Sequence, residues 1–282
     1  MNIVSNLLQG KHGIVMGVAN ERSIAWGIAK TLSSHGAGIA FSYQSEALFR
    51  RLKPLAETIG SSILIECDVA SEDSIDAFFK QLTAKWSTVD FFVHAIAHSD
   101  KDQLKGNYYD TTKDNFLKSL DISCYSFTSL CRRMQSVMSN GGSMVTLSYL
   151  GSERVMPNYN VMGIAKAALE SSVRYMAMDL GPRNIRVNAI SAGPIRTLAS
   201  AGINDFRYIL KWNQHNSPLR RNTTPEDVGG AAVFLVSDLG AGVTGDVIYV
   251  DSGYHSIGMK AIDAPDISTV VTSSSGGDLS SV

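Results

Sequence analysis

The chain has 282 residues, of which 44% are hydrophobic and 18% are charged, and its formal net charge is −1. This balance is typical of a globular protein with a sizeable core, and the near-neutral charge argues against nucleic acid or an anionic membrane as a partner. The three cysteines are too few and too scattered for a disulfide framework or a zinc site, so we expect reduced thiols.

Short apolar runs alternate with segments of helical periodicity along most of the chain. The runs predict seven strands, at 13–19, 37–43, 61–69, 89–97, 142–149, 185–191 and 246–251. The segments between them predict helices at 23–36, 46–60, 74–86, 112–138, 158–180 and 226–238. Because the runs are too apolar for one-sided exposure, the alternation indicates an α/β Rossmann-type fold, a doubly wound parallel sheet with helices on both faces.

These elements predict one domain over residues 1–262. Within it, residues 194–221 form a long excursion that is typical of a lid or binding element, with a surface decoration as the alternative. Residues 263–282 are rich in Ser and Gly, which predicts a flexible tail. No apolar run approaches the ~20 residues that span a bilayer, and the first residues do not resemble a secretory signal, so we expect a cytoplasmic protein without membrane contact.

A glycine, Gly17, ends the first predicted strand, and Ser23 follows at the start of the next helix. Gly17 permits a tight turn, Ser23 can cap the helix or contact a phosphate, and the helix N-terminus offers free N–H groups to a pyrophosphate. Gly27 predicts close helix–strand packing. The spacing departs from the usual G-x-G-x-x-G, so an ordinary turn without a ligand is an equal alternative.

The end of the second predicted strand carries Gln44, at the position where dinucleotide-binding enzymes read the adenosine ribose. An amide can bond the ribose hydroxyls but offers no charge to a 2′-phosphate, which favours NADH. Arg22 is the one basic group that could weaken this preference. After the third strand, Asp68 and Val69 can contact adenine, with a turn or N-cap role for Asp68 as the alternative.

Two histidines, His94 and His98, end the fourth predicted strand with a spacing of four residues. The segment is strand-like and lacks a supporting carboxylate, so we expect no metal site. The small side chains of Ala95 and Ala97 favour a place where a cofactor packs against the sheet edge.

Tyr159 and Lys166 fall on the helix predicted at 158–180. Seven residues advance an α-helix by about 700°, ~20° short of two turns, so we expect both side chains on one face, within reach of a ligand along the helix. Lys166 can bond ribose hydroxyls, and its charge favours negative charge on an oxygen near Tyr159. A core tyrosine beside a snorkelling lysine is the alternative.

The strings "LSYLGSERVMPNYNVMGIAKAALE" (147–170) and "RYMAMDLGPRNIRVNAISAGPIRTLA" (174–199) resemble the enoyl-acyl-carrier-protein reductases of bacterial fatty acid synthesis, in the short-chain dehydrogenase/reductase superfamily. The resemblance covers about residues 10–260. Most of the superfamily spaces tyrosine and lysine as Y-x-x-x-K, whereas this chain has Gly163 there and Lys166 three residues later. The longer spacing, with a second tyrosine ten residues upstream, resembles the enoyl-reductase branch and argues against a ketoreductase.

The resemblance implies that NADH reduces the trans-2 double bond of enoyl-acyl-carrier-protein thioesters, the last reductive step of the fatty acid elongation cycle. It implies that Tyr159 bonds the developing enolate oxygen, Lys166 holds the nicotinamide ribose, and Tyr149 contacts the substrate. It implies a further substrate contact at Ser99. The implied cofactor residues are Gly17, Ser23, Ile24, Gln44, Asp68, Val69, Ile96, Lys166, Ile195, Arg196, Thr197, Leu198 and Ala199.

The resemblance also implies a lid over the acyl chain at residues 198–218, a homotetramer, and acyl carrier protein as the partner that carries the substrate. The apolar lid residues are Leu198, Ala199, Ile203, Phe206 and Ile209, with ordinary packing as the alternative for each. Two other functions stay open: reduction of a carbonyl such as that of a 3-ketoacyl thioester, and NAD(H) sensing without turnover. Fold alone does not decide among them.

Overall fold

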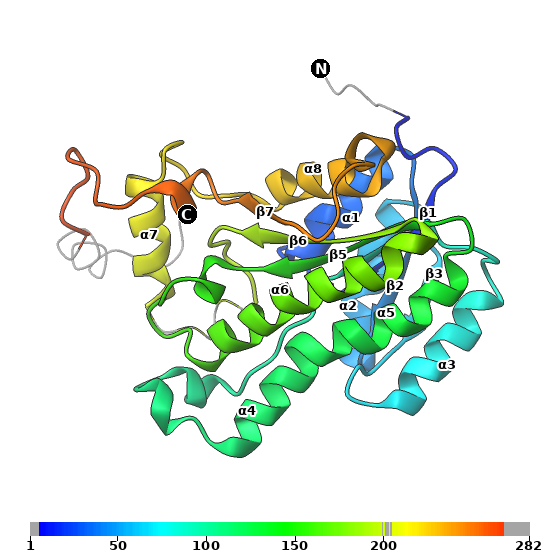
Figure 1. Ribbon diagram of the computed structural model, residues 1–282, viewed down its shortest axis with the longest axis horizontal. Coiled ribbons are helices and arrows are strands. Elements are labelled where there is room, and N and C mark those ends of the chain that lie inside the picture. Colours follow the sequence, from blue (N-terminus) through cyan, green and yellow to red (C-terminus); the bar gives the residue numbers. More distant parts are fainter. Residues whose placement is uncertain (1–5, 199, 201–202, 204, 268–282) are drawn as a thin grey trace.

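Seven parallel strands form one sheet, in the order β3-β2-β1-β4-β5-β6-β7 (Figure 1). The computed structural model describes residues 6–198, 200, 203 and 205–267. The strands are β1 His12–Met16, β2 Gly38–Tyr43, β3 Ile63–Glu66, β4 Phe91–His94, β5 Gly142–Ser148, β6 Ile185–Ala192 and β7 Val247–Val250. The chain winds outward from β1 to β3 and then returns to place β4 on the other side of β1. The predicted Rossmann-type fold is confirmed.

Helices cover both faces of the sheet (Figure 1). They are α1 Ile24–Ser34, α2 Glu46–Thr58, α3 Glu72–Thr83, α4 Lys113–Leu120, α5 Ser126–Val137, α6 Val161–Leu180, α7 Phe206–Asn216 and α8 Pro225–Val236. One apolar core lies on the side of α3, α5 and α6 and includes Phe78, Phe127 and Leu169. The other lies on the side of α1, α2 and α8. Burial on both faces explains why the strands read as continuous apolar runs.

The prediction of one continuous helix at 112–138 is wrong in one respect, because a π-helical turn, Asp121–Tyr125, separates α4 from α5. Such a turn holds an extra residue within the helical path. Here it turns Ser123 inward, where its hydroxyl accepts from the His98 amide at 2.9 Å and donates to the His98 carbonyl at 3.1 Å. The turn thereby holds the segment that leaves β4.

At the C-terminal end, the structure describes the predicted tail only as far as residue 267. Asp263 forms an ion pair with Arg220 at 2.8 Å, and Ile267 is buried. Residues 268–282 lie outside the described residues.

Among the described residues, no helix combines the length and the apolar character that crossing a membrane requires.

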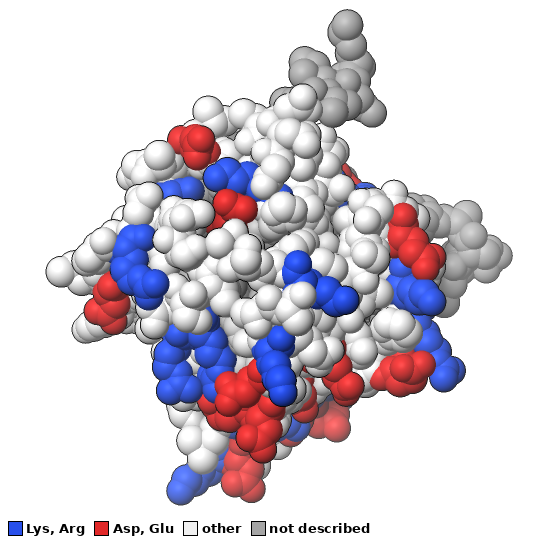
Figure 2. All heavy atoms as spheres, turned by 90° about the vertical axis from the view of Figure 1, so that its right-hand side faces the viewer, with Lys and Arg blue, Asp and Glu red and all other residues white. Residues whose placement is uncertain are grey.

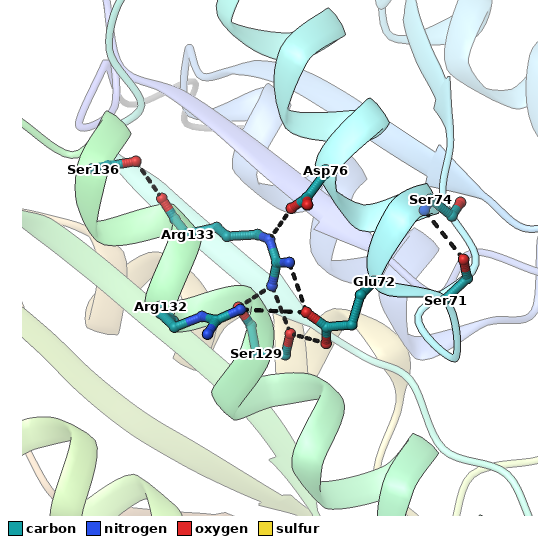
Figure 3. Close-up of polar contacts among 8 residues, drawn as sticks. All are labelled: Ser71, Glu72, Ser74, Asp76, Ser129, Arg132, Arg133 and Ser136. Carbon is teal, nitrogen blue, oxygen red and sulfur yellow. Dashed lines mark hydrogen bonds and ion pairs between the residues drawn. The ribbon is translucent and has the colours of Figure 1, made fainter.

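Acidic and basic side chains are interspersed on the side of the molecule opposite α7 (Figure 2). A network of charged and polar side chains joins α3 to α5 (Figure 3). Arg133, 13% exposed, reaches from α5 to Glu72 at 2.7 Å and also contacts Asp76. Ser129 donates to the other oxygen of Glu72 at 2.8 Å. The hydrogen bonds from Arg133 and Ser129 lower the pKa of Glu72 below its usual 4.5.

This lowered pKa predicts an acid-sensitive contribution to stability. A carboxyl whose pKa is lower in the folded state stabilises the fold above its unfolded pKa and loses that effect as pH falls through the folded value. We therefore expect Glu72→Gln to melt below wild type at pH 7, with the difference shrinking below about pH 4.5. Thermal melts across pH measure this, with Glu57→Gln on the exposed face of α2 as the control. A difference that does not depend on pH would contradict it.

Candidate active site

The chain turns sharply after β1, where it approaches the carboxyl end of β4. Gly17 has φ of +99°, and a Cβ there would lie 2.0 Å from the carbonyl oxygen of Ala95. Only glycine fits this position, so the predicted tight turn is confirmed. Since β1 and β4 are neighbours whose onward connections run in opposite directions, this is the switch point at which doubly wound sheets bind nucleotides.

Ser23 stands at the N-cap of α1, but its side chain makes no capping hydrogen bond, so of its two predicted roles the capping role is wrong. The Ser23 hydroxyl instead accepts from the amides of Ala19 and Asn20, both at 3.0 Å, and so holds the loop before the helix. In contrast, Ser71 and Thr224 cap α3 and α8 with their side chains. In the described part of the chain, α1 has neither a side-chain cap nor an acidic residue in its first turn, so none of its own side chains competes with an anion at this end of the helix.

Gly27 brings two helices together. A Cβ at Gly27 would lie 2.3 Å from the Cβ of Pro225, the first residue of α8. The predicted helix–strand packing at this glycine is therefore wrong, because this face of α1 meets α8 and not the sheet.

Two predicted cofactor residues meet at the ends of β2 and β3. The Gln44 amide donates to Asp68 at 3.2 Å, and the same carboxylate oxygen accepts from the Ala70 amide at 3.0 Å. The turn role of Asp68 is confirmed, whereas the N-cap of α3 is Ser71. Val69 packs partly buried against the core.

The two histidines after β4 have different environments. His94 is fully buried, and its ring nitrogens lie 2.9 Å from the hydroxyls of Thr146 and Ser126. Burial lowers the pKa of His94 to about 3, so the ring is neutral and serves the core. His98 lies on the surface beside Asp100, at 3.4 Å. Among the described residues, no group of three His, Cys, Asp or Glu could hold a metal.

Ile96 and Ser99 lie on the segment that follows β4. Ile96 is partly buried against the core on the side of α3, α5 and α6. Ser99 exchanges hydrogen bonds with the Asn115 side chain of α4, at 3.1 and 3.3 Å. The structure thus anchors both predicted residues beside the carboxyl end of β4.

Tyr159 lies in a turn and not on a helix, because α6 begins at Val161. Asn158 and Asn160 have positive φ of 57° and 39°, which asparagine tolerates better than most residues. The predicted helical face shared with Lys166 is therefore wrong. The turn nevertheless brings the tyrosines together, with the rings of Tyr149 and Tyr159 edge to face at 5.0 Å between centroids.

Burial sets the protonation of this group. Lys166 is 6% exposed, and its ammonium donates to the Leu147 carbonyl of β5 at 2.7 Å. Burial lowers the pKa of Lys166 to about 8 and raises the pKa values of Tyr149 and Tyr159. Near neutral pH, Lys166 is thus mainly charged and both phenols stay protonated. The buried Tyr149 hydroxyl has no hydrogen-bond partner among the described residues, which points to a ligand.

The segment after β6 lies across a cavity of about 470 Å³ from the loop that precedes α1. Within this segment Ile195 is buried, and Thr197 is held by hydrogen bonds with Ser200. The residues that line the cavity come from the first turn, this segment and α7: Asn20, Arg22, Arg196, Thr197, Leu198, Ser200, Ile203, Asp205, Phe206, Arg207 and Leu210. Predicted cofactor and lid residues thus meet at one opening, which carries three arginines and one aspartate.

A second, more apolar cavity of about 210 Å³ lies beside Tyr149. It is lined by Tyr149, Val155, Met156, Pro157, Pro194, Tyr208, Ile209, Trp212, Asn213 and Tyr254. The predicted lid residues therefore divide: Ile209 lines this cavity, whereas Leu198, Ile203 and Phe206 line the larger one. Ala199 lies outside the described residues.

Comparison with known proteins identifies the family. The sequence profile described as Enoyl-(Acyl carrier protein) reductase matches residues 17–255. A curated enoyl-[acyl-carrier-protein] reductase [NADH] of Rhizobium meliloti is 60% identical over 94% of this chain and 98% of its own length. The chain belongs to the enoyl-acyl-carrier-protein reductase family.

Solved structures of the family share this fold closely. The enzyme of Anaplasma phagocytophilum, solved in complex with NAD, is 55% identical and superposes with a TM-score of 0.89 over 93% of this chain and 98% of its own. The enzyme of Bacillus cereus, solved with NADP+ and an indole naphthyridinone, is 51% identical, with a TM-score of 0.88 over 90% and 99%. The resemblance seen in the sequence is confirmed.

One buried polar residue of this reductase was not predicted from the sequence. Glu170 follows Lys166 by one helical turn, is 6% exposed, and accepts hydrogen bonds from Ser148 and Ser152. A signal existed, because Leu169 and Val173 mark the apolar side of the helix and place a carboxylate among core residues.

Gly17→Ala tests the turn at the switch point. A left-handed backbone costs a residue with a Cβ about 1–3 kcal/mol, and contact with the Ala95 carbonyl adds to it. We expect a loss of unfolding free energy above about 3 kcal/mol, measured by denaturant titration, together with weaker NADH binding. Gly10→Ala is the matched control, since Gly10 has φ of +78° with nothing within 4 Å. Equal losses would show that the contact is unimportant.

Proposed function

We propose that this chain reduces the trans-2 double bond of enoyl-acyl-carrier-protein thioesters with NADH. The observation that carries the proposal is the cluster of Tyr149, Tyr159 and buried Lys166 beside the nucleotide edge of the sheet. It is supported by relatives whose names state the same reaction and cofactor. Acyl carrier protein is then the partner that delivers the substrate.

The residues present fit NADH. The uncapped start of α1 suits a pyrophosphate, and the Gln44–Asp68 pair offers polar atoms to the adenosine. When bound, NADH supplies the hydride for C3 of the substrate. The residues proposed to hold it are Gly17, Ser23, Ile24, Gln44, Asp68, Val69, Ile96, Lys166, Ile195, Arg196, Thr197, Leu198 and Ala199.

Tyr159 stabilises the substrate oxygen. Burial raises the pKa of Tyr159, so its phenol donates a hydrogen bond without losing its proton. Such a donor is most effective where negative charge develops, here on the thioester oxygen as the enolate forms. The charge of Lys166 adds positive potential, and its remaining N–H donors serve the nicotinamide ribose.

Tyr149 contacts the substrate next to the reacting carbons. Its buried hydroxyl without a partner among the described residues, and the apolar cavity beside it, suit the thioester end of an acyl chain. Ser99 adds a polar contact near β4. Residues 194–221 act as the lid, with Ile209 against the chain.

Carbonyl reduction by a Y-x-x-x-K pair is disfavoured by packing. The lysine position of that pattern holds Gly163, and a Cβ there would lie 2.6 Å from the Gly151 carbonyl. A lysine has no room at this position, so Lys166 is the cation that serves Tyr159. A sensor without turnover is disfavoured because the tyrosines and the lysine are all present and buried together.

The cofactor preference is proposed to be NADH. Gln44 carries no charge for a 2′-phosphate, whereas Arg22 lies on the rim of the larger cavity. We further propose a cytoplasmic enzyme, since Cys67, Cys124 and Cys131 are free thiols whose pKa values are raised by burial.

Steady-state assays test the reaction and the two tyrosines. Purified protein is expected to consume NADH when a crotonyl thioester is the substrate. The rate with NADH is expected to exceed the rate with NADPH. Tyr159→Phe removes the donor to the enolate and is expected to lower kcat by about 10²–10³-fold, whereas Tyr149→Phe lowers it less. NADH binding followed by fluorescence is the control for both variants. No NADH consumption, or consumption only with a 3-ketoacyl thioester, would refute the function, and equal losses would refute the division of roles.

We also propose a homotetramer. Five large apolar residues are exposed along α4, the π-helical turn and α6: Leu117, Tyr125, Ile164, Tyr175 and Met178. Large apolar residues exposed on neighbouring helices are typical of subunit interfaces. Light scattering is expected to give four times the monomer mass, and Met178→Glu a smaller assembly, with Asp179→Asn unchanged. A monomeric wild type would remove the proposal.

A further inference from the structure

A buried carboxylate with no part in the proposed reaction lies next to its residues. Glu170 follows Lys166 by four positions on α6, so both side chains lie on one side of the helix. One oxygen of Glu170 accepts hydrogen bonds from the hydroxyls of Ser148 and Ser152, the latter at 2.7 Å. A buried carboxylate is costly unless it is bonded in this way, so the site asks for an explanation.

The two serines lie on either side of Tyr149. Ser148 ends β5, and Ser152 ends the short 3₁₀ turn Leu150–Ser152. Lys166 binds the carbonyl of Leu147, the residue before them, at 2.7 Å. One side of α6 therefore bonds the two residues before Tyr149 and the end of the 3₁₀ turn that follows it.

The same 3₁₀ turn packs on the second tyrosine. A Cβ at Gly151 would lie 2.4 Å from the Tyr159 ring, and one at Gly163 would lie 2.6 Å from the Gly151 carbonyl. The turn is thus in direct contact with the Tyr159 ring and with the first turn of α6. A shift of the turn would move Tyr149 and Tyr159 relative to Lys166.

We propose that Glu170 is a positioning residue, which holds Tyr149 and Tyr159 in register with Lys166 through Ser148 and Ser152. This inference rests on the proposed function. It assigns Glu170 no contact with substrate or cofactor.

The charge of Glu170 has a second effect, on Lys166. The titratable groups around Lys166 are Cys124 from the π-helical turn, His94 from β4, Glu170, and the phenols of Tyr149 and Tyr159, which stay protonated because burial raises their pKa values. Burial keeps Cys124 a neutral thiol by raising its pKa, and His94 is neutral because its pKa is about 3. Glu170 is therefore the charged neighbour that opposes the effect of burial, which lowers the pKa of Lys166 to about 8.

Two substitutions separate position from charge. Glu170→Ala removes the acceptor and the charge, and we expect kcat to fall about 10–100-fold, as misplacement of reacting groups by about 1 Å does, while the NADH dissociation constant changes less than about 3-fold. Glu170→Gln keeps a carbonyl acceptor, so kcat near pH 7 is largely rescued. Its alkaline limb of activity moves to lower pH, because Lys166 loses its proton more easily. Asp179→Asn, on the exposed side of α6, is the matched control and leaves both unchanged.

A double-mutant cycle tests the contact itself. Ser152→Ala is expected to lower kcat, and Glu170→Ala combined with Ser152→Ala to lower it less than the product of the two single effects. Independent effects would show that the hydrogen bond does not transmit position. Since Glu170→Ala could fail to fold, thermal melts accompany each variant, and Glu170→Gln and Ser152→Ala carry the test alone if it does.

Failure of this inference differs from failure of the function. If wild type reduces the enoyl thioester but Glu170→Ala keeps wild-type kcat, the positioning role is overturned and the function stands. If Glu170→Gln keeps the wild-type pH profile, the effect of the Glu170 charge on Lys166 is overturned. If wild type shows no NADH consumption, the function fails. The effect of the Glu170 charge on Lys166 is then decided by the pH dependence of Lys166 acylation, read by peptide mass spectrometry. An unchanged Lys166 pKa in Glu170→Gln would overturn that effect.

Discussion

Parallel pairing of all seven strands is the constraint on which the rest of this structure depends. Each connection must cross back over a face of the sheet, so every strand ends at the same edge. That edge gathers residues that are far apart in the chain: the turn at Gly17, the Gln44–Asp68 pair, and Tyr149 after β5. Buried connections would leave polar backbone unsatisfied, so the long excursion after β6 lies at this edge and forms cavities with it.

Buried polar groups give this edge its chemistry. His94 is neutral and bonded on both ring nitrogens, so it serves the packing between β4 and β5. Lys166 is also buried but keeps most of its charge near neutral pH, because the Leu147 carbonyl and the Glu170 carboxylate compensate for part of the lost hydration. The tyrosines keep their protons for the same reason that Lys166 tends to lose its own, since burial disfavours the charged form of each.

Two irregular segments flank the cluster, and both were missed in the sequence. The π-helical turn between α4 and α5 places the Ser123 hydroxyl against the backbone of His98, which follows β4. Asn158 and Asn160, which have positive φ, delay the start of α6 until Val161. Periodicity extends a helix through such segments because the apolar pattern on either side is continuous. Departures of this kind are common at functional sites, where position matters more than regular geometry.

The sequence by itself determined the seven apolar runs that form strands, the α/β class, the turn at Gly17, and the spacing that separates Tyr159 and Lys166 from the Y-x-x-x-K pattern. These follow from local periodicity and residue chemistry, which neighbouring residues encode. Only the tertiary structure decided that Ser23 holds a loop, that Gly27 meets α8, that Tyr159 lies outside the helix, and that Glu170 bonds Ser148 and Ser152. Each of these depends on which atoms packing brings within a few ångströms, and a pattern along one chain carries no record of those distances.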